Sequence, residues 1–295
     1  MSLDFDIRSA IMIGAFLNVL IAVMLLIVRN ALPRAYQYSM SWWWLGLVLQ
    51  PTGFVLIALR GYIHPVFTIV LANITVAAAL ACFAIALRTF TGVRQRRWVA
   101  YWLIIAAGMT AFVFSIVYDN LLIRATLLSL VHAILLAFAA RAIYRQELKI
   151  TRVSHALAGL FVIGAISMLA RAIYHAVTQD PIPDFFSLRW PTVLTYGAGG
   201  LLPIVGTIGF LLMCTERSEK YLARMASEDP LTGVYNRRAL ADFGAREMAR
   251  ARRHGTPLSV ILVDIDFFKR INDELGHAAG DLALIETVRR LRKNL

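Results

Sequence analysis

The sequence is poor in charged residues and almost devoid of cysteine. Only 16% of its 295 residues are Asp, Glu, Lys or Arg, whereas soluble domains average about 25%. Hydrophobic residues make up 59%, and the mean hydropathy is +0.66, which excludes a single soluble domain. Cys82 and Cys214 lie within or at the end of apolar runs, with no Cys or His at metal-ligand spacing. Neither a disulfide framework nor a zinc site is expected.

Acidic residues are nearly missing from the middle of the chain. Between residues 29 and 179 the sequence has only Asp119 and Glu147, both in expected loops. A ladder of buried acidic groups, as proton-coupled transporters use, is therefore absent from this stretch of sequence. A membrane sensor is favoured over a transporter.

The apolar residues gather into long runs. A helix that crosses a bilayer needs about 20 predominantly apolar residues. Seven stretches meet this length: 10–28, 40–59, 65–87, 98–117, 121–140, 153–175 and 192–214. The first is expected to stay as a membrane helix, because Asp4 and Asp6 replace the basic leader of a signal peptide. Trp42, Trp43 and Trp44 near a helix end are interpreted as aromatics of the membrane interface.

The formal net charge of +12 is interpreted as a signal for how the chain is oriented in a membrane, and not for nucleic-acid binding. The reason is that most of the excess positive charge lies in short loops between the apolar runs. The loops on one side of the expected membrane hold ten basic residues, and those on the other side hold five. The ten are Arg29, Arg34, Arg88, Arg94, Arg96, Arg97, Arg141, Arg145, Lys149 and Arg152, and the five are Arg8, Arg60, Arg124, Arg171 and Arg189. The first set is expected in the cytoplasm, so the N-terminus lies outside and the C-terminus inside, in a bacterial inner membrane. No nucleic-acid partner is expected.

Ionisable residues within or beside these runs have two interpretations. They are Arg60, His64, Arg124, His132, Arg171 and His175. One interpretation is an outward-facing pocket for a small, anionic signal. The other is arginines reaching for lipid headgroups and histidines bonded inside a helix bundle. Gly199 to Pro203 would weaken the seventh helix and is a candidate hinge.

Residues 215–228 predict a helical signalling linker. No Gly or Pro occurs from Glu216 until Pro230, so the seventh helix is expected to continue into a stalk. Leu211, Cys214, Ser218, Tyr221 and Met225 approximate a heptad seam. Because this seam covers only two heptads and contains a serine, the sequence favours neither a dimeric coiled coil nor a single helix.

The remaining residues, 229–295, carry polar motifs around one expected strand. Asp229-Pro-Leu-Thr-Gly-Val-Tyr-Asn-Arg-Arg238 opens a helix, and Leu258 to Val263 reads as a buried strand. Asp264-Ile-Asp266 follows directly. Carboxylates at the carboxyl end of a strand suit Mg²⁺ and phosphates, although a lone Asp-x-Asp could equally cap the next helix.

The residues that follow complete the pattern D-x-D-x-F-K-x-I-N-D-x-x-G-H-x-x-G-D over residues 264–281. Together with D-x-L-T-G-x-x-N-R-R upstream, this closely resembles the first half of the GGDEF domain of bacterial diguanylate cyclases. The resemblance implies an α/β, palm-like nucleotide-cyclase domain. It also implies a homodimer in which two GTP molecules become cyclic di-GMP and two diphosphates.

The resemblance assigns roles to individual residues. Asp264 and the carbonyl of Ile265 would bind the catalytic Mg²⁺. The backbone around Phe267, Phe268 and Lys269 would approach the nucleotide phosphates, and Asn272 with Asp281 would recognise guanine. A carboxylate can accept hydrogen bonds from guanine, whereas N1 of adenine is itself an acceptor. Asp266, Asp273, Gly276 and His277 match the motif too but are expected to shape loops and helix ends.

The expected fold is mainly α: a seven-helix transmembrane region over 1–214, the linker over 215–228, and an incomplete GGDEF domain over 229–295. The sequence does not reach the G-G-[DE]-E-F loop that names the family. Two hypotheses stay open. The sequence is the front portion of a membrane diguanylate cyclase, or it is a non-catalytic membrane sensor or interaction protein with a GGDEF remnant. The 295 residues alone are expected to be inactive.

Overall fold

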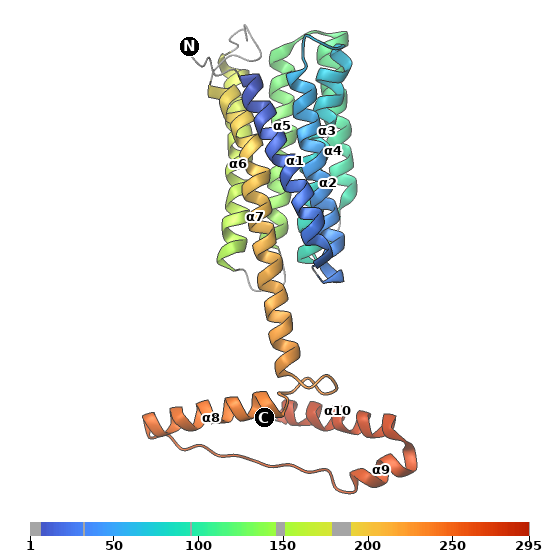
Figure 1. Ribbon diagram of the computed structural model, residues 1–295, viewed down its shortest axis with the longest axis vertical. Coiled ribbons are helices and arrows are strands. Elements are labelled where there is room, and N and C mark those ends of the chain that lie inside the picture. Colours follow the sequence, from blue (N-terminus) through green and yellow to red (C-terminus); the bar gives the residue numbers. More distant parts are fainter. Residues whose placement is uncertain (1–6, 32, 95, 146–150, 179–189, 295) are drawn as a thin grey trace. The chain divides into compact units, whose positions relative to one another are not determined.

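A computed structural model describes residues 7–31, 33–94, 96–145, 151–178 and 190–294 (Figure 1). The expectations for Asp4, Asp6, Glu147, Lys149 and Arg189 lie outside these residues. The chain divides into two units, Met1–Cys214 and Thr215–Leu295. The described residues are predominantly helical and form no sheet, which confirms a mainly α protein.

The first unit is a bundle of long apolar helices. They are α1 (Ile7–Ala31), α2 (Arg34–Ala58), α3 (Ala72–Thr91), α4 (Arg97–Phe112), α5 (Leu121–Tyr144), α6 (Arg152–Thr178) and α7 (Trp190–Ser227). Short π-helical segments, η1 (Val66–Leu71) and η2 (Val113–Val117), extend α3 and α4. In the described part of the chain, seven helical stretches are long and apolar enough to cross a membrane, as the sequence predicts.

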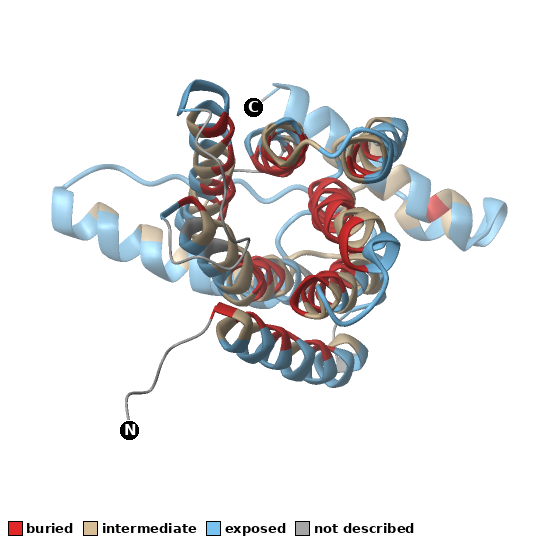
Figure 2. Ribbon diagram, turned by 90° about the horizontal axis from the view of Figure 1, so that it is seen from above, coloured by how far each residue is buried: buried red, intermediate tan, exposed pale blue. Residues whose placement is uncertain are grey.

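The apolar surface of the bundle faces both inward and outward. Buried residues line the facing sides of the helices, while the outer sides are exposed (Figure 2). On α1, Phe16, Met24 and Ile27 are 62%, 66% and 72% exposed. Water would not favour such a continuous apolar surface, whereas lipid would. The exposure pattern therefore agrees with a bundle that sits in a bilayer.

Aromatic side chains from four helices form the centre of the core. The rings of Trp43 and Phe210 stack with centroids 4.5 Å apart, and Phe83 and Phe161 lie 4.8 and 6.4 Å from Trp43. The indole Nε1 of Trp43 donates to Thr207 Oγ1 at 2.9 Å. Trp43 is fully buried, so its interpretation as an interfacial residue was wrong. Its place near a helix end said nothing about which face of the helix it occupies.

The seventh helix continues beyond Cys214 as predicted, because α7 ends only at Ser227. The second unit then contains α8 (Arg237–His254), α9 (Phe268–Leu275) and α10 (His277–Asn294). Helices α9 and α10 pack against each other. The side chain of Met225 lies outside the described set, and pairing of two stalks stays a prediction.

The strand expected at Leu258 to Val263 is not formed. These residues are irregular, and Val260, Ile261 and Leu262 are 87%, 78% and 96% exposed. A strand needs a neighbour for its amide and carbonyl groups, and no sheet exists among the described residues. The segment has the apolar, β-branched composition of a strand but no strand to pair with among the described residues.

Candidate functional site

The D-x-L-T-G-x-x-N motif forms a hydrogen-bonded turn between α7 and α8. Asp229 Oδ1 accepts from the amide and the hydroxyl of Thr232 at 2.9 and 2.7 Å. The amide of Gly233, which has φ 65°, donates to the carbonyl of Asp229 at 2.9 Å. The hydroxyl of Thr232, and then its amide, lower the pKa of the Asp229 carboxyl. The carboxylate that stabilises this turn therefore persists until the pH falls through that lowered pKa.

Asn236 joins the two helices that this turn separates. Its Nδ2 donates to the carbonyl of Ala226 near the end of α7, at 2.8 Å. Its Oδ1 accepts from the amide of Ala239 at 3.0 Å and so caps the first turn of α8. One side chain thus satisfies groups at the end of one helix and at the beginning of the next, which explains why this position in the motif is an asparagine.

Removing this cap gives a testable prediction. Asn236→Ala should destabilise the first turn of α8 by about 1 kcal/mol, which makes its amides exchange with solvent roughly fivefold faster. Hydrogen–deuterium exchange on the full chain measures this. Asn294→Ala is the matched control, because Asn294 donates to the carbonyl of Arg290 within the last turn of its own helix, α10. Equal exchange in the two variants would contradict a capping role for Asn236.

The residues expected to hold Mg²⁺ lie just before α9. The side chain of Asp264 is exposed, and the carbonyl of Ile265 accepts from the amide of Phe268 at 3.2 Å. The carbonyl oxygen has a second lone pair, with which it could bind a metal ion. Two protein oxygens fit Mg²⁺, which commonly takes few protein ligands and completes its shell with water and phosphate oxygens. Among the described residues, no three His, Cys, Asp or Glu side chains form a metal-binding group.

The backbone at the beginning of α9 has an unusual conformation. Phe267 has φ 57° and ψ 24°, which a non-glycine residue rarely adopts. A left-handed residue next to a helical one turns successive amides toward the same side, an arrangement found in anion-binding loops. The amide of Phe268 already donates to Ile265, and Lys269 is exposed. The amides of Phe267 and Lys269 are thus the better candidates for phosphate.

The two expected guanine-recognition residues come from adjoining helices. Gly276, with φ 82°, ends α9 and lets α10 begin at the next residue. This bend packs the side chain of Asn272 against Gly280, the chain neighbour of Asp281. A Cβ atom on Gly280 would lie 2.0 Å from Asn272 Oδ1. Gly280 is the one buried residue among those described in α10.

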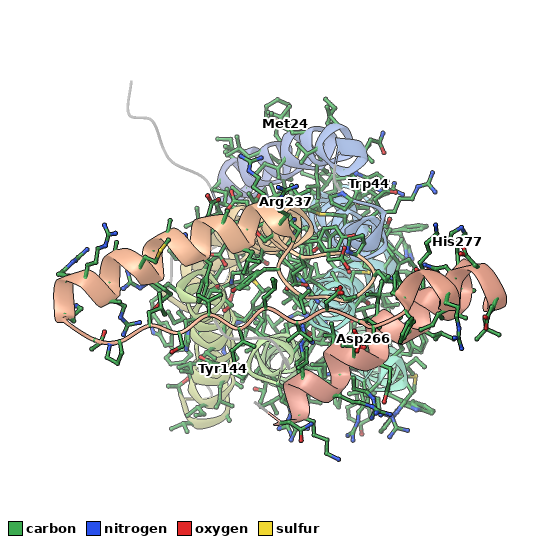
Figure 3. All side chains as sticks on the ribbon, turned by 90° about the horizontal axis from the view of Figure 1, so that it is seen from below. Met24, Trp44, Tyr144, Arg237, Asp266 and His277 are labelled. Atoms are coloured by element: carbon green, nitrogen blue, oxygen red, sulfur yellow. The ribbon has the colours of Figure 1, made fainter. Side chains whose placement is uncertain are left out.

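Sequence reasoning did not assign a role to Gly280, although the motif contains it. The available signal was a glycine inside a helix, where it costs stability relative to alanine. The structure gives the reason, since only a residue without Cβ leaves room for Asn272. Asp266 and His277 are both exposed, and Figure 3 shows them at separate places, before α9 and at the beginning of α10.

Comparison with known proteins identifies this segment. Residues 226–295 match the family described as "Diguanylate cyclase, GGDEF domain". This segment of the chain is therefore similar to GGDEF domains. No solved structure matches the chain.

Two curated relatives of the GGDEF segment bear cyclase names. Diguanylate cyclase DgcP of Pseudomonas aeruginosa is 50% identical over 70 residues, which are 24% of this chain and 10% of the relative. Diguanylate cyclase DosC of Escherichia coli K12 is 43% identical over 82 residues, or 28% of this chain and 18% of the relative. An uncharacterized signaling protein of Caulobacter vibrioides is 43% identical over 75 residues, or 25% and 9%. The chain thus spans less than a quarter of the length of these relatives.

Proposed function

We propose that the protein containing this chain is a membrane-bound diguanylate cyclase controlled by its seven-helix region. The observation that carries the proposal is the GGDEF match over residues 226–295. The packing of Asn272 against Gly280 supports it, because Gly280 is the chain neighbour of Asp281, the other residue assigned to guanine. The proposed location is a bacterial inner membrane, with the C-terminus in the cytoplasm.

The residues can be given roles in the proposed reaction. Asp264 and the Ile265 carbonyl would hold Mg²⁺, which supplies positive charge beside the phosphates of GTP. The amides near Phe267 and Lys269 would bind phosphate oxygens. Asn272 and Asp281 would hold the base and so fix the position of the ribose.

The proposed reaction needs two GTP molecules, one on each protomer of a homodimer. The 3′-hydroxyl of each GTP attacks the α-phosphate of the other. Two phosphodiester bonds form, two α–β phosphoanhydride bonds break, and two diphosphates and two protons leave. Because each half-site alone lacks a reaction partner, dimerisation is a natural point of control for the stalk.

A second candidate is a non-catalytic membrane sensor or interaction protein with a GGDEF remnant. The observation that favours it is the exposed, unpaired segment 258–263. The DNA that follows the codon for Leu295 separates the two candidates. An in-frame continuation that encodes G-G-[DE]-E-F supports the cyclase, and a stop codon supports the sensor.

The activity test uses purified membranes, GTP and Mg²⁺, with cyclic di-GMP measured by mass spectrometry. The protein encoded with the continuation should form cyclic di-GMP, and the 295-residue chain should form none. The second result is expected because the residues of the signature loop are missing from those 295. Absence of product from the longer protein, correctly inserted and dimeric, would contradict the proposed activity.

The proposed orientation predicts which loops meet the outside. Tyr62→Cys should react with a membrane-impermeant thiol reagent in intact spheroplasts, because Tyr62 is 75% exposed in an expected outer loop. Lys220→Cys on the stalk should react only after the membrane is opened. The native Cys82 and Cys214 are buried and give a low background. The reverse labelling pattern would contradict a cytoplasmic GGDEF segment.

A further inference from the structure

The first unit contains a cavity of about 100 Å³ between its helices. Arg60 lies two residues after the end of α2, Arg124 lies in the first turn of α5, and Arg171 lies in the last two turns of α6. All three line the cavity. Because consecutive helices alternate in direction, these positions belong to one end of the bundle, opposite the end at which α7 leaves it. Of the other ionisable residues that the sequence grouped here, His132 also lines the cavity.

The cavity has a strong positive charge. Arginine keeps its charge even when buried, and Arg124 is only 4% exposed. Arg124 Nη1 lies 3.8 Å from Asp119 Oδ1 and donates to the carbonyl of Phe114 at 2.9 Å. Asp119 is 85% exposed, so its negative charge is largely screened by solvent and offsets the buried charge of Arg124 weakly. None of the described residues that line the cavity is Asp or Glu. Three guanidinium groups in one apolar bundle favour an anion among them.

Two further polar groups of the cavity wall have an unused hydrogen-bonding atom. His132 and Gln50 are 8% and 2% exposed. His132 Nε2 and Gln50 Oε1 are buried without a hydrogen-bond partner among the described residues. The Gln50 amide is oriented by its Nε2, which donates to the carbonyl of Gly199 at 2.6 Å. Its oxygen therefore needs a donor, which an ionised carboxylate group cannot supply but a hydroxyl group beside it can.

The partner of Gln50 lies where the continuous helix α7 lacks one backbone hydrogen bond. Pro203 has no amide hydrogen, so the carbonyl of Gly199, four residues earlier, loses its helical partner. Gln50 Nε2 takes that place. The ring of Phe54 packs on the same residue, since a Cβ atom on Gly199 would lie 2.6 Å from Phe54 Cζ. Gln50, Phe54 and Gly199 all line the cavity, so whatever binds there lies beside this point of the α7 backbone.

We propose that this cavity binds a small hydroxycarboxylate and that its occupancy is read by the Gln50–Gly199 hydrogen bond, where Pro203 leaves α7 without one backbone hydrogen bond. Arg171 and His132 hold the carboxylate, Arg60 and Arg124 add positive charge to the same cavity, and the ligand hydroxyl donates to Gln50 Oε1. Apolar wall residues such as Ile57 and Met168 contact its carbon atoms. A volume of this size is somewhat below that of an engineered cavity of about 150 Å³ that binds benzene, which limits the ligand to about six heavy atoms.

The binding test uses the 295-residue chain in phosphatidylcholine nanodiscs and lactate as the probe. Lactamide removes the charge, and propanoate removes the hydroxyl. Isothermal titration should show saturable lactate binding that is at least tenfold tighter than binding of either control. Arg171→Gln should weaken it at least tenfold, whereas Arg141→Gln at the other end of α5 should not change it. The circular dichroism of both variants must match the parent.

Three results would overturn the proposal: no saturable lactate binding, equal binding of lactamide or propanoate, or equal losses in the two arginine variants. Loss of lactate binding when phosphatidylglycerol is added would also overturn it and assign the arginines to lipid headgroups. None of these measurements uses cyclase activity, so they succeed or fail independently of the proposed reaction.

The link to α7 has its own measurement. Lactate should slow hydrogen–deuterium exchange at least threefold in peptides that cover residues 199–210. A ligand bonded to Gln50 Oε1 would fix the Gln50 amide, which donates to the carbonyl of Gly199 in α7. Gln50→Leu should abolish this protection. Arg141→Gln, which lies away from the cavity, should retain it. Lactate binding with unchanged exchange in the parent would overturn the coupling to α7.

Discussion

Asp264→Ala is expected to lower cyclic di-GMP formation at least about a hundredfold in the form of the protein that carries the whole GGDEF domain. The carboxylate is the one charged protein ligand to Mg²⁺ assigned within residues 229–295. Even residues that only support a metal ligand typically change affinity or activity 10- to 100-fold, so loss of a direct ligand should cost at least as much. Product formed from GTP in purified membranes gives the measurement.

The control for this prediction is Asp242→Ala, which removes an exposed carboxylate from α8 without touching the expected site. It should retain full turnover. Both variants should insert into the membrane to the same extent, since neither changes an apolar run. Turnover by Asp264→Ala at the parent rate would remove Asp264 from the metal site and leave the proposed mechanism without its assigned ligand.

The sequence predicted the membrane part of the fold well, because lipid imposes a simple requirement. Each crossing needs a long apolar run with internally satisfied backbone groups, and seven such runs became seven helices. The face of each helix was less predictable. Trp43, in a run of three tryptophans, points into the core and stacks on Phe210, which lies far along the chain. When both the core of the bundle and the surrounding lipid are apolar, hydrophobicity does not predict whether an apolar side chain points inward or outward.

The cavity shows a second limit of sequence reasoning. The sequence identified Arg60, Arg124 and Arg171 as unusual, but left open whether they shared a pocket. Only the packing of α2, α5 and α6 brings them together. The role of Gln50 was missed, since a glutamine in an apolar run has no pattern that links it to a proline more than 150 residues later. Its hydrogen bond to Gly199 follows from the fold alone.

The strand prediction failed for a different reason. The composition of Leu258 to Val263 is that of a buried strand, yet a strand depends on partners at other places in the chain. Helices α8, α9 and α10 pair most of their backbone amide and carbonyl groups within themselves, so they form in the described residues without such partners. Local signals therefore sufficed for the helix that follows the motif at 229–238 and for the helix end at Gly276.

Gly280→Ala is expected to reduce the preference of the complete enzyme for GTP over ATP by tenfold to a hundredfold. The new methyl group would lie 2.0 Å from Asn272 Oδ1, so the two cannot keep their places. Asn272 can rotate away more easily than the backbone of α10 can move. Losing its contact with guanine should cost about 1–3 kcal/mol, the usual penalty for an unmatched polar group. Competition between GTP and ATP in the cyclase assay measures the preference.

Gly244→Ala is a matched control on α8, because apart from its chain neighbours and the adjacent backbone of α8 nothing lies within 4 Å of the position its Cβ would take. It should leave nucleotide preference unchanged and stabilise the helix slightly. The decisive comparison is a double-mutant cycle. If Gly280 acts only by making room for Asn272, then Gly280→Ala should have almost no further effect in an Asn272→Ala background. Additive losses would instead mean that Gly280 supports the fold of α9 and α10 independently, and that Asn272 does not depend on it to meet the base.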